Sequence, residues 1–439
     1  MSDNRMKRRT FLKQSAVIGA GLVVGKSGIL RAGNSPNEKL NVAVIGVGGR
    51  GGSNLGNVQS ENIVALCDVN GKNLASAAKR FENAKTYVDW RKCLEQKNID
   101  AVVCSTTDHT HAFVNVWAMN RGMHVYCEKP IANSVEEAQM VRATYMRNKN
   151  KIATQMGTQI HASDNYRRMV ELIRGGAIGT PKEVRVWCSR MPAGGSYLPE
   201  VKPIPDGLNW DLWVGPAPFH AYNPGYVGGC LKWNRFWDFG SGQIGDMGSH
   251  MMDMAAWGFD LKLPTTCKAE GTEQNSDTLP QQLVAEWDHP ANDWRPAIKA
   301  YWYDGGKKPG MPSEAFNREK LFKGALFKGD KGWLLADYGF RMLMLKGDMT
   351  HYKSPKASEL IPPSIGHHKE WIVACKTDKK TTCNFDYSGA LIEANMLALV
   401  AYRVGKKLDW DAKNMKATNC PEADAYIRKS YRKGWVLNG

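Results

Sequence analysis

A glycine-rich turn near the start of the chain has the residue types that bind phosphate. Residues 41–51 read N-V-A-V-I-G-V-G-G-R-G, so Gly46, Gly48 and Gly51 directly follow an apolar run. Glycine at these places permits a tight turn, close approach of a phosphate to the backbone, and close packing of the helix that follows. The free N–H groups at the start of that helix attract an anion. We therefore expect a turn that binds a pyrophosphate.

An acidic residue follows this turn at the end of the next apolar run. That run, 63–67, leads into Asp68, whose carboxylate can accept a hydrogen bond from a ribose 2′-hydroxyl and would repel a 2′-phosphate. The pattern predicts NAD as the cofactor and makes NADP the less favoured alternative. Gly49 and Arg50 lie inside the turn and are also expected to contact the cofactor, where Arg50 could hold a phosphate.

The first part of the chain, residues 36–160, is predicted to form the domain that positions this turn. Strand-like runs at 100–104 and 124–127 alternate with helical segments, one of them at 113–121. Strands alternating with helices predict an α/β fold with a doubly wound parallel sheet. Such sheets bind ligands at the carboxyl ends of their strands.

Several polar side chains are expected at that edge, in the loop 105–111, in the E-K-P that follows the run 124–127, and just beyond the sheet. The expected cofactor contacts are Thr106, Asp108, His109, His111, Glu128, Lys129 and Gln159. For His109 and His111 an alternative stays open, in which the backbone of the loop satisfies one of the imidazoles.

The pattern changes in residues 161–439, which are predicted to form a second, substrate-binding domain. Strand-like segments follow one another without intervening helices, at 184–187, 283–287, 298–303, 331–335 and 342–345. This order predicts a large, mostly antiparallel sheet in an α+β domain. Helices are expected over 166–174, 243–259 and 388–404.

Asp246 and His250 could carry proton transfer. Residues 245–253 read G-D-M-G-S-H-M-M-D, and on one helix Asp246 and His250 would share a face. An imidazole, with an ordinary pKa of about 6.5, suits general acid–base work. Two alternatives remain: a packed histidine, and a zinc or manganese site in which His161 and Asp253 join the other two. We predict no metal.

An aromatic-rich segment, 190–235, has no clear period and continues to Trp237. Aromatic faces suit sugar rings, so a carbohydrate cleft is one interpretation, and a loop packed on its own aromatics is the other. The predicted substrate contacts are His161, Tyr222, Trp233 and Trp237. At 367–368, two histidines mark a helix start, with ligand and surface roles both open.

Composition excludes some classes of protein. The chain has 439 residues and a net charge of +16, with Lys and Arg scattered rather than clustered, so nucleic-acid binding is not indicated. The ten cysteines form no C-x-x-C, which argues against a zinc ribbon or a thioredoxin-like site. Disulfides stay possible but cannot be paired from the sequence.

The first 35 residues are predicted to be a leader. A basic stretch at 7–13 (K-R-R-T-F-L-K) precedes an apolar, glycine-rich stretch at 16–25 that is too short to span a bilayer. The R-R-T-F-L-K order resembles the twin-arginine export signal, which implies a periplasmic or exported protein. A basic disordered leader is the alternative, and retention as a membrane anchor stays open.

Four segments together resemble the glucose–fructose oxidoreductase/inositol dehydrogenase/MocA family: 43–51, 107–111, 124–130 (H-V-Y-C-E-K-P) and 175–179. The resemblance covers about residues 38 to 420. It implies a Rossmann domain, a second domain whose open sheet covers the nicotinamide, and a homodimer or homotetramer formed through that sheet.

The resemblance also implies a catalytic group of Lys129, Asp246 and His250. His250 would take the hydroxyl proton as hydride leaves the carbon, and Lys129 would stabilise the substrate oxygen. Asp246 would orient the imidazole or hold a neighbouring hydroxyl.

We therefore expect an exported, NAD-dependent oxidoreductase that acts on a hydroxyl of a sugar or glycoside, with carbon 3 as the favoured position and with tightly held NAD. One alternative is a glycoside hydrolase that oxidises, eliminates, hydrates and reduces, with Tyr222 or Tyr226 as an extra base. A non-catalytic sugar-binding protein is the second alternative.

Overall fold

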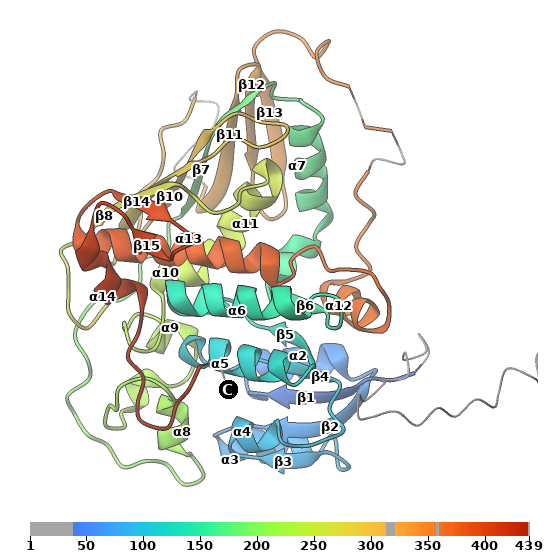
Figure 1. The fold of residues 1–439 in the computed structure, drawn as a ribbon, viewed down its shortest axis with the longest axis vertical. Coiled ribbons are helices and arrows are strands. Elements are labelled where there is room, and N and C mark those ends of the chain that lie inside the picture. The colour runs from blue at the N-terminus through green and yellow to red at the C-terminus, as the bar shows by residue number, and fades with distance from the viewer. Residues whose placement is uncertain (1–37, 313–320, 354, 357–359, 438–439) are drawn as a thin grey trace, which may run out of the picture. The chain divides into compact units, whose positions relative to one another are not determined.

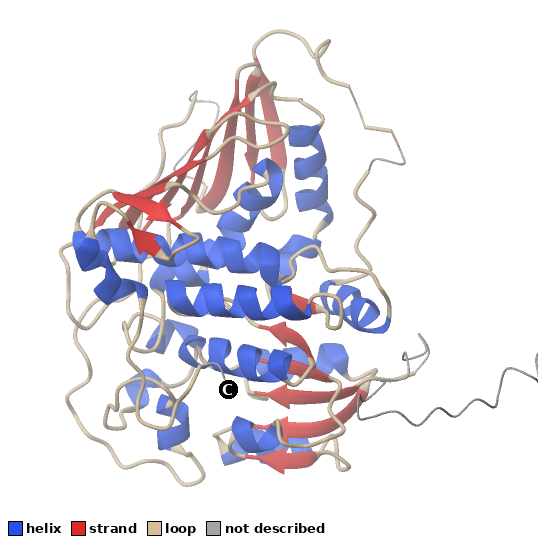
Figure 2. Ribbon diagram, viewed as in Figure 1, coloured by secondary structure: helices blue, strands red, loops and turns tan. Residues whose placement is uncertain are grey.

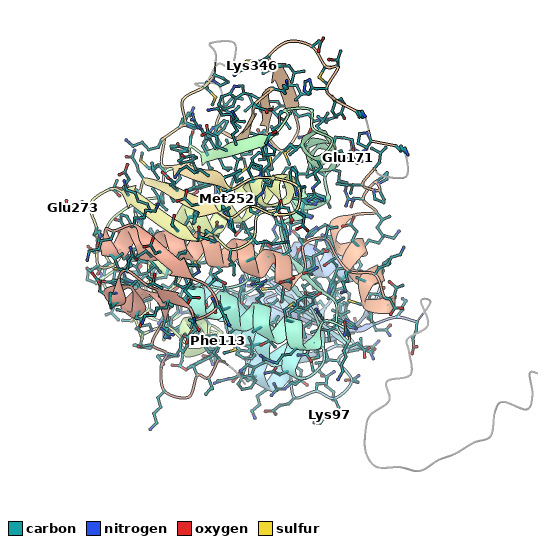
Figure 3. All side chains as sticks on the ribbon, turned by 45° about the horizontal axis from the view of Figure 1, so that its top comes forward. Lys97, Phe113, Glu171, Met252, Glu273 and Lys346 are labelled. Carbon is teal, nitrogen blue, oxygen red and sulfur yellow. The ribbon has the colours of Figure 1, made fainter. Side chains whose placement is uncertain are left out.

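The computed structural model describes residues 38–312, 321–353, 355–356 and 360–437. The predicted leader, residues 1–35, lies outside this range. From Lys39 onward the chain forms one compact unit. Within the described residues, no helix is both long and apolar enough to cross a bilayer. Figure 3 shows Phe113 and Met252 inside this unit, whereas Lys97, Glu273 and Lys346 project at its surface.

Two separate sheets, with helices between them, organise the described chain (Figure 2). The first sheet has six parallel strands in the order β3-β2-β1-β4-β5-β6. Its strands are β1 (Asn41–Ile45), β2 (Asn62–Cys67), β3 (Lys85–Tyr87), β4 (Ala101–Cys104), β5 (His124–Cys127) and β6 (Thr154–Met156). This doubly wound sheet confirms the predicted α/β class.

Alternation along β1 explains why helices cover both faces of this sheet. Val42 and Val44 pack into the apolar cluster that contains Leu55, whereas Ala43 and Ile45 pack into the cluster that contains Phe113. The helices are α2 (Arg50–Val58), α3 (Gly71–Ala78), α4 (Trp90–Cys93), α5 (Asp108–Asn120) and α6 (Val135–Asn148). Because successive side chains point to opposite faces, a continuous apolar strand needs cover on both sides.

Helix α5 begins earlier than the sequence predicted. The loop expected over 105–111 ends at Thr107, and Asp108 starts the helix. A carboxylate in the first turn complements the positive end of the helix dipole, which favours this start. His109 and His111 therefore lie in the first helical turn and not in a loop.

The second sheet has nine strands in the order β13-β12-β11-β7-β10-β9-β8-β14-β15. All its pairs are antiparallel except β7 with β10. The strands are β7 (Pro181–Cys188), β8 (Thr266–Gly271), β9 (Leu283–His289), β10 (Ile298–Asp304), β11 (Lys323–Gly329), β12 (Gly332–Ala336), β13 (Arg341–Leu345), β14 (Leu408–Asp411) and β15 (Lys416–Ala417). The predicted antiparallel character is confirmed, although β8, β11, β14 and β15 were not predicted.

Helices link the two sheets. Helix α6 lies beside α13 (Phe385–Val404) across the middle of Figure 1, and Arg142 of α6 pairs with Asp386 of α13 at 2.8 Å. Helix α7 (Asp164–Arg174) packs on α11 (Gly248–Phe259), and α11 contacts β7 and β11. The carboxyl ends of the first sheet thus face elements of the second domain.

The single helix predicted over 243–259 is wrong, because it is two helices. Helix α10 (Gly242–Asp246) ends before Met247, and α11 starts at Gly248. Glycine lowers helix propensity, and a Cβ on Gly245 would lie 1.8 Å from the Ser241 hydroxyl oxygen. The break places Asp246 at the end of one helix and His250 in the first turn of the next.

The glycine turn gives a matched stability test. A Cβ on Gly51 would lie 1.9 Å from the Gly46 carbonyl oxygen, whereas a Cβ on Gly56 of the same helix would meet nothing within 4 Å. We expect Gly51→Ala to lower the free energy of unfolding by about 1–3 kcal/mol. Gly56→Ala should raise it by up to about 1 kcal/mol. Equal effects of the two variants in urea unfolding would contradict this packing.

Candidate functional site

A cavity of about 1250 Å³ opens at the carboxyl ends of the first sheet. Ligand pockets usually enclose about 300–1,000 Å³, so this one has room for a dinucleotide and a second molecule. It is lined by the glycine turn and by residues from both sheets. Of the predicted site residues, it holds Gly46, Gly48, Gly49, Arg50, Asp68, Thr106, Asp108, His111, Glu128, Lys129, Gln159, Tyr222, Trp233, Asp246 and His250.

The turn after β1 has the geometry that a pyrophosphate requires. Gly46 adopts φ +79°, and a Cβ there would lie 2.4 Å from the Ser105 carbonyl oxygen. The amides of Gly49 and Arg50 donate to no oxygen within the described residues. Free amides at a helix start are the usual partners of phosphate oxygens.

Asp68 holds this turn in place and still faces the cavity. Its Oδ2 accepts from the amides of Val47 (2.9 Å) and Gly48 (3.2 Å), and its Oδ1 accepts from Asn70 (2.8 Å). Burial raises the pKa of Asp68 even though these bonds oppose the rise. A carboxylate offers about four acceptor positions, so capacity remains for a ribose hydroxyl. The glycine turn and Asp68 therefore have the groups needed to bind the pyrophosphate and a ribose of NAD.

Glu128 is an internal support for the cavity floor. Its Oε1 accepts from Asn54 Nδ2 (3.0 Å) and Gln159 Nε2 (2.8 Å). Gln159 also donates to the Tyr126 hydroxyl at 2.9 Å. Burial raises the pKa of Glu128. Because both partners are fixed, Glu128 and Gln159 form a rigid polar surface next to Lys129.

Lys129, which is half-buried, forms an ion pair with buried Asp246 that joins the two domains. The second oxygen of Asp246 accepts from Arg190 Nη1 at 2.9 Å. Burial alone would raise the pKa of Asp246 and lower that of Lys129, but the pair reverses both shifts. Both groups are therefore charged.

His250 is neutral and has one ring nitrogen available. Its Nδ1 lies 3.0 Å from the Thr158 hydroxyl, while Nε2 bonds to none of the described residues and the side chain lines the cavity. Burial, reinforced by the charge of Lys129, lowers the pKa of His250 to about 3. A neutral imidazole beside an ammonium group places a proton acceptor and a hydrogen-bond donor in one cavity.

Four predicted site residues do not line the cavity. Gly51 packs against Gly46, as its missing Cβ requires. Trp237 donates through Nε1 to the Asn275 carbonyl oxygen and lies under the Arg403 guanidinium. The other two are the histidines at positions 109 and 161.

His161 is fully buried away from the cavity. It stacks on Trp257 with ring centroids 4.0 Å apart, and its Nδ1 lies 2.9 Å from Asp253. Asp253 also accepts from the Tyr387 hydroxyl. Since Asp246 is paired with Lys129 instead, the four proposed ligands of a zinc or manganese site do not come together.

His109 and His111 are both held by backbone carbonyl oxygens. His109 contacts those of Phe239 (3.2 Å) and Trp213 (3.1 Å), and His111 contacts those of Pro130 (2.6 Å) and Thr106 (3.0 Å). Burial lowers the pKa of each histidine to about 4. The backbone alternative therefore describes both residues, although only His111 reaches the cavity.

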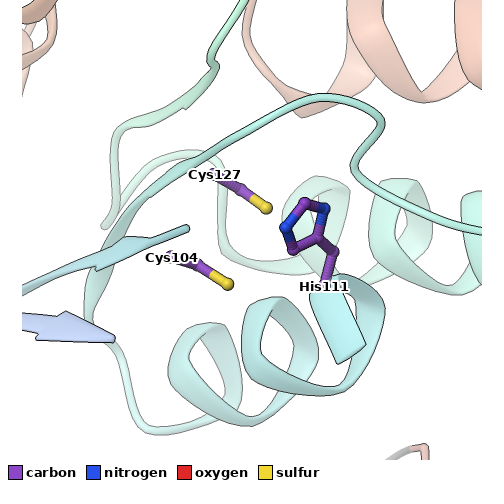
Figure 4. A group of neighbouring side chains, drawn as sticks. All are labelled: Cys104, His111 and Cys127. Carbon is purple, nitrogen blue, oxygen red and sulfur yellow. The ribbon is translucent and has the colours of Figure 1, made fainter. Parts of the chain in front are cut away.

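His111 also lies beside two thiols at the ends of β4 and β5 (Figure 4). Its possible ligand atom and the sulfur atoms of Cys104 and Cys127 lie within 4.8 Å of one another, all buried. Because both imidazole nitrogens already face carbonyl oxygens, metal binding would require at least one of those contacts to break. All ten cysteines, each in the described part of the chain, are free thiols.

The aromatic segment combines the two interpretations given above. Trp210, Tyr226, Phe236 and Phe239 belong to one buried cluster, and Tyr222 and Trp233 of that cluster also line the cavity. The histidines at 367–368 are neither surface residues nor cavity residues, since both are buried and His368 stacks on Tyr126 with centroids 4.6 Å apart.

Sequence reasoning missed residues that come from separate elements of the second domain. Arg190 follows β7, Lys323 begins β11 and Tyr338 follows β12, and all three line the cavity near His250. Thr158, which contacts His250, follows β6. None of these four residues belongs to a recognisable sequence motif. Only a prediction of the sheet order could have assigned them to the cavity.

The fold and the site together define a class of protein. The glycine turn, the cavity and the first sheet are those of an NAD-binding Rossmann protein, here with a second sheet-containing domain. Residues 40–156 match the family model for "Oxidoreductase family, NAD-binding Rossmann fold", and residues 167–437 match the one for "Oxidoreductase family, C-terminal alpha/beta domain". The chain belongs to this Gfo/Idh/MocA oxidoreductase family.

Curated relatives match less than half of the chain. The inositol 2-dehydrogenase of Salmonella typhimurium is 30% identical over 147 residues, which is 32% of this chain and 44% of that protein. The levoglucosan dehydrogenase of Pseudarthrobacter phenanthrenivorans is 28% identical over 199 residues, 44% of this chain and 41% of that protein. The chain thus spans less than half the length of these relatives.

Solved structures share the fold across most of the chain. The WlbA dehydrogenase from Bordetella pertussis, in complex with NADH and UDP-GlcNAcA, has a TM-score of 0.60 at 15% identity and covers 85% of this chain and 98% of that one. Levoglucosan dehydrogenase, in complex with NADH and levoglucosan, has a TM-score of 0.56 at 18% identity, covering 85% and 99%.

Removing the charge of Asp246 should destabilise the protein strongly. Asp246→Asn leaves the Lys129 ammonium buried without its counter-charge, and we expect a loss of about 3–5 kcal/mol in the free energy of unfolding. Glu95→Gln is the matched control, because Glu95 pairs with Lys92 at 3.0 Å on the exposed surface. That change should cost at most about 1 kcal/mol. Losses of similar size in urea unfolding would refute the buried pair.

The imidazole of His250 should not titrate near neutral pH. Its pKa of about 3 predicts constant NMR shifts from about pH 5 to pH 8, with the resonance assigned by its loss in His250→Asn. In denaturant the same imidazole should titrate at about 6.5. Below about pH 6.5 the imidazole therefore binds a proton in the unfolded chain but stays neutral in the folded protein. The free energy of unfolding should for this reason fall as the pH falls below about 6.5. A native titration near 6.5 would contradict the neutral state of His250.

Proposed function

We propose that the protein is an NAD-dependent oxidoreductase that oxidises a CH–OH group of a sugar or glycoside. The observation that carries this proposal is the meeting of neutral His250 and charged Lys129 in the cavity that also contains the glycine turn. An alcohol oxidation needs these two groups: an acceptor for the hydroxyl proton and a positive donor for the oxygen.

The reaction follows from the available atoms. The hydroxyl proton passes to Nε2 of His250, the C–H bond breaks with its electron pair leaving as hydride, and a C=O bond forms. Bound NAD supplies the hydride acceptor. Lys129 donates a hydrogen bond to the substrate oxygen as negative charge develops there, while Asp246, which Arg190 also bonds, keeps that ammonium in place. Thr158 fixes the imidazole through Nδ1.

The substrate class is supported by the relatives and by the cavity wall. Relatives of this chain are named for inositol and levoglucosan, both polyhydroxylated rings. Tyr222 and Trp233 give the cavity two aromatic side chains that suit such a ring. We retain carbon 3 as the favoured position, because a ketone there acidifies the neighbouring C–H bond.

We also propose an exported, homo-oligomeric protein. Export is supported by the basic and apolar stretches at 7–13 and 16–25. Assembly is supported by the second sheet, whose half-exposed side chains include Tyr301, Tyr303 and Trp333.

A glycoside hydrolase that uses NAD transiently is the second candidate. Tyr226 is a poor extra base, because it is fully buried and its hydroxyl accepts from the Leu198 amide at 2.7 Å. Tyr222 reaches the cavity and keeps this candidate open.

An activity assay tests the proposal. Purified protein with added NAD is incubated with myo-inositol, levoglucosan, glucose and nitrophenyl glycosides, and NADH absorbance and products are followed. We expect a keto sugar with NADH, and a loss of about 10²–10⁴-fold in rate for His250→Asn, because the proton acceptor is removed. His351→Asn, outside the cavity, should keep the wild-type rate.

Other products would redirect the proposal. Release of sugar and aglycone without net NADH favours the hydrolase. Retained sugar affinity without any turnover favours a binding protein, and equal rates in His250→Asn and wild type would remove His250 from the mechanism.

A further inference from the structure

One turn of the second domain pairs with the first domain beside Asp68. We call residues 205–209 (P-D-G-L-N) the strap. The Gly71 amide donates to the Gly207 carbonyl oxygen at 2.7 Å, and the Asn209 amide donates to the Val69 carbonyl oxygen at 2.8 Å. Between these bonds, position 208 forms an antiparallel bridge with position 70. The strap, which is distant in sequence, thus pairs through its backbone with the residues that follow β2.

The strap is a folded turn with fixed ends. The Leu208 amide donates to the Pro205 carbonyl oxygen at 3.1 Å, and Gly207 has the positive φ of +81° that this turn needs. Asn209 accepts from the Leu212 amide at 3.0 Å and so caps α8 (Trp210–Val214). These bonds shape the strap as a turn that leads into α8.

The C-terminal segment braces α8 against the first domain. Arg432 pairs with Asp211 at 2.6 Å and donates through Nε to the Gly215 carbonyl oxygen at 2.8 Å. Three residues further on, Trp435 packs against Trp90 with ring centroids 6.2 Å apart. The strap is therefore held from the C-terminal side as well.

The strap forms a wall of the cavity where a cofactor's adenosine would lie. Pro205, Asp206 and Leu208 line the cavity together with Asp68, and Asp68 is the residue type that binds the ribose of NAD. Val88, at the end of β3, is 42% exposed although it is apolar, and it lines the same cavity. Apolar side chains on both sides of a ribose-binding carboxylate suit the faces of an adenine ring.

We propose that the strap closes over the adenosine half of bound NAD and makes its release slow. Backbone pairing at Val69 and Gly71 then has to break before the cofactor leaves. The inference rests on NAD binding and is independent of the sugar that the protein oxidises. It explains how one chain could retain its cofactor through repeated turnovers.

Gly71→Pro removes one of the two backbone hydrogen bonds between the strap and the first domain, with little change elsewhere. Gly71 is the first residue of α3, a position that favours proline, and Asn70 already has the extended conformation (φ −100°, ψ 107°) that precedes proline. The substitution deletes the donor to Gly207 and adds atoms on the strap side, where even a Cβ would lie 3.1 Å from that carbonyl oxygen.

Asp164→Pro is the matched control. Asp164 is the first residue of α7, and Ser163 before it is also extended (φ −73°, ψ 146°). Its side chain is exposed and, among the described residues, forms one ion pair, with Arg168 at 3.6 Å. Leu208→Ala is a second variant, which removes a cavity side chain and leaves the backbone pairing intact.

The test is the release rate of NADH, followed by fluorescence after a chase with excess NAD. We expect at least about tenfold faster release from Gly71→Pro, a smaller acceleration from Leu208→Ala, and the wild-type rate from Asp164→Pro. Folded Gly71→Pro with unchanged release would overturn the strap. If Gly71→Pro does not fold, an unchanged rate in Leu208→Ala overturns it. Failure of wild-type protein to bind NADH would instead refute the cofactor site itself.

Discussion

The ion pair between Lys129 and Asp246 is the constraint on which the rest of the site depends. A buried ammonium without a partner loses several kcal/mol of hydration, so the second domain has to deliver a carboxylate to the end of β5. The break at Met247 makes this possible, because α10 ends at Asp246 and a new helix, α11, begins at Gly248 with His250 in its first turn. Arg190 then occupies the second carboxylate oxygen. Removal of the charge of Lys129, Asp246 or Arg190 would leave the remaining charges without full compensation.

This arrangement fixes opposite proton states in a single cavity. Lys129 stays charged because Asp246 is near, and His250 stays neutral because burial and the charge of Lys129 both disfavour a second cation. In the proposed reaction, a hydrogen-bond donor for the substrate oxygen and an acceptor for its proton are thereby in place before substrate binds. The glycine turn and residues of the strap line the same cavity as His250 and Lys129.

Local sequence patterns predicted the strands and site residues of the first domain well and those of the second domain poorly. Strand β5 was predicted at its observed bounds because an apolar run and E-K-P delimit it, and the turn residues followed from their spacing. Strand β11 (K-G-A-L-F-K-G) was missed because glycines interrupt it and its stability comes from pairing with β7 and β12. His161 was misplaced for a similar reason: its partners, Asp253 and Trp257, lie far away in sequence. Arg190 could be assigned only once the sheet order was known.

Transfer of deuterium from a sugar carbon to bound NAD tests the central claim most directly. The compound that reacts fastest is labelled with deuterium at its oxidised carbon, and the cofactor released from the protein is analysed by mass spectrometry. Direct hydride removal beside His250 and Lys129 predicts one deuterium in the nicotinamide ring and none in His250→Asn within the same time. Product formation with an unlabelled cofactor would contradict the account.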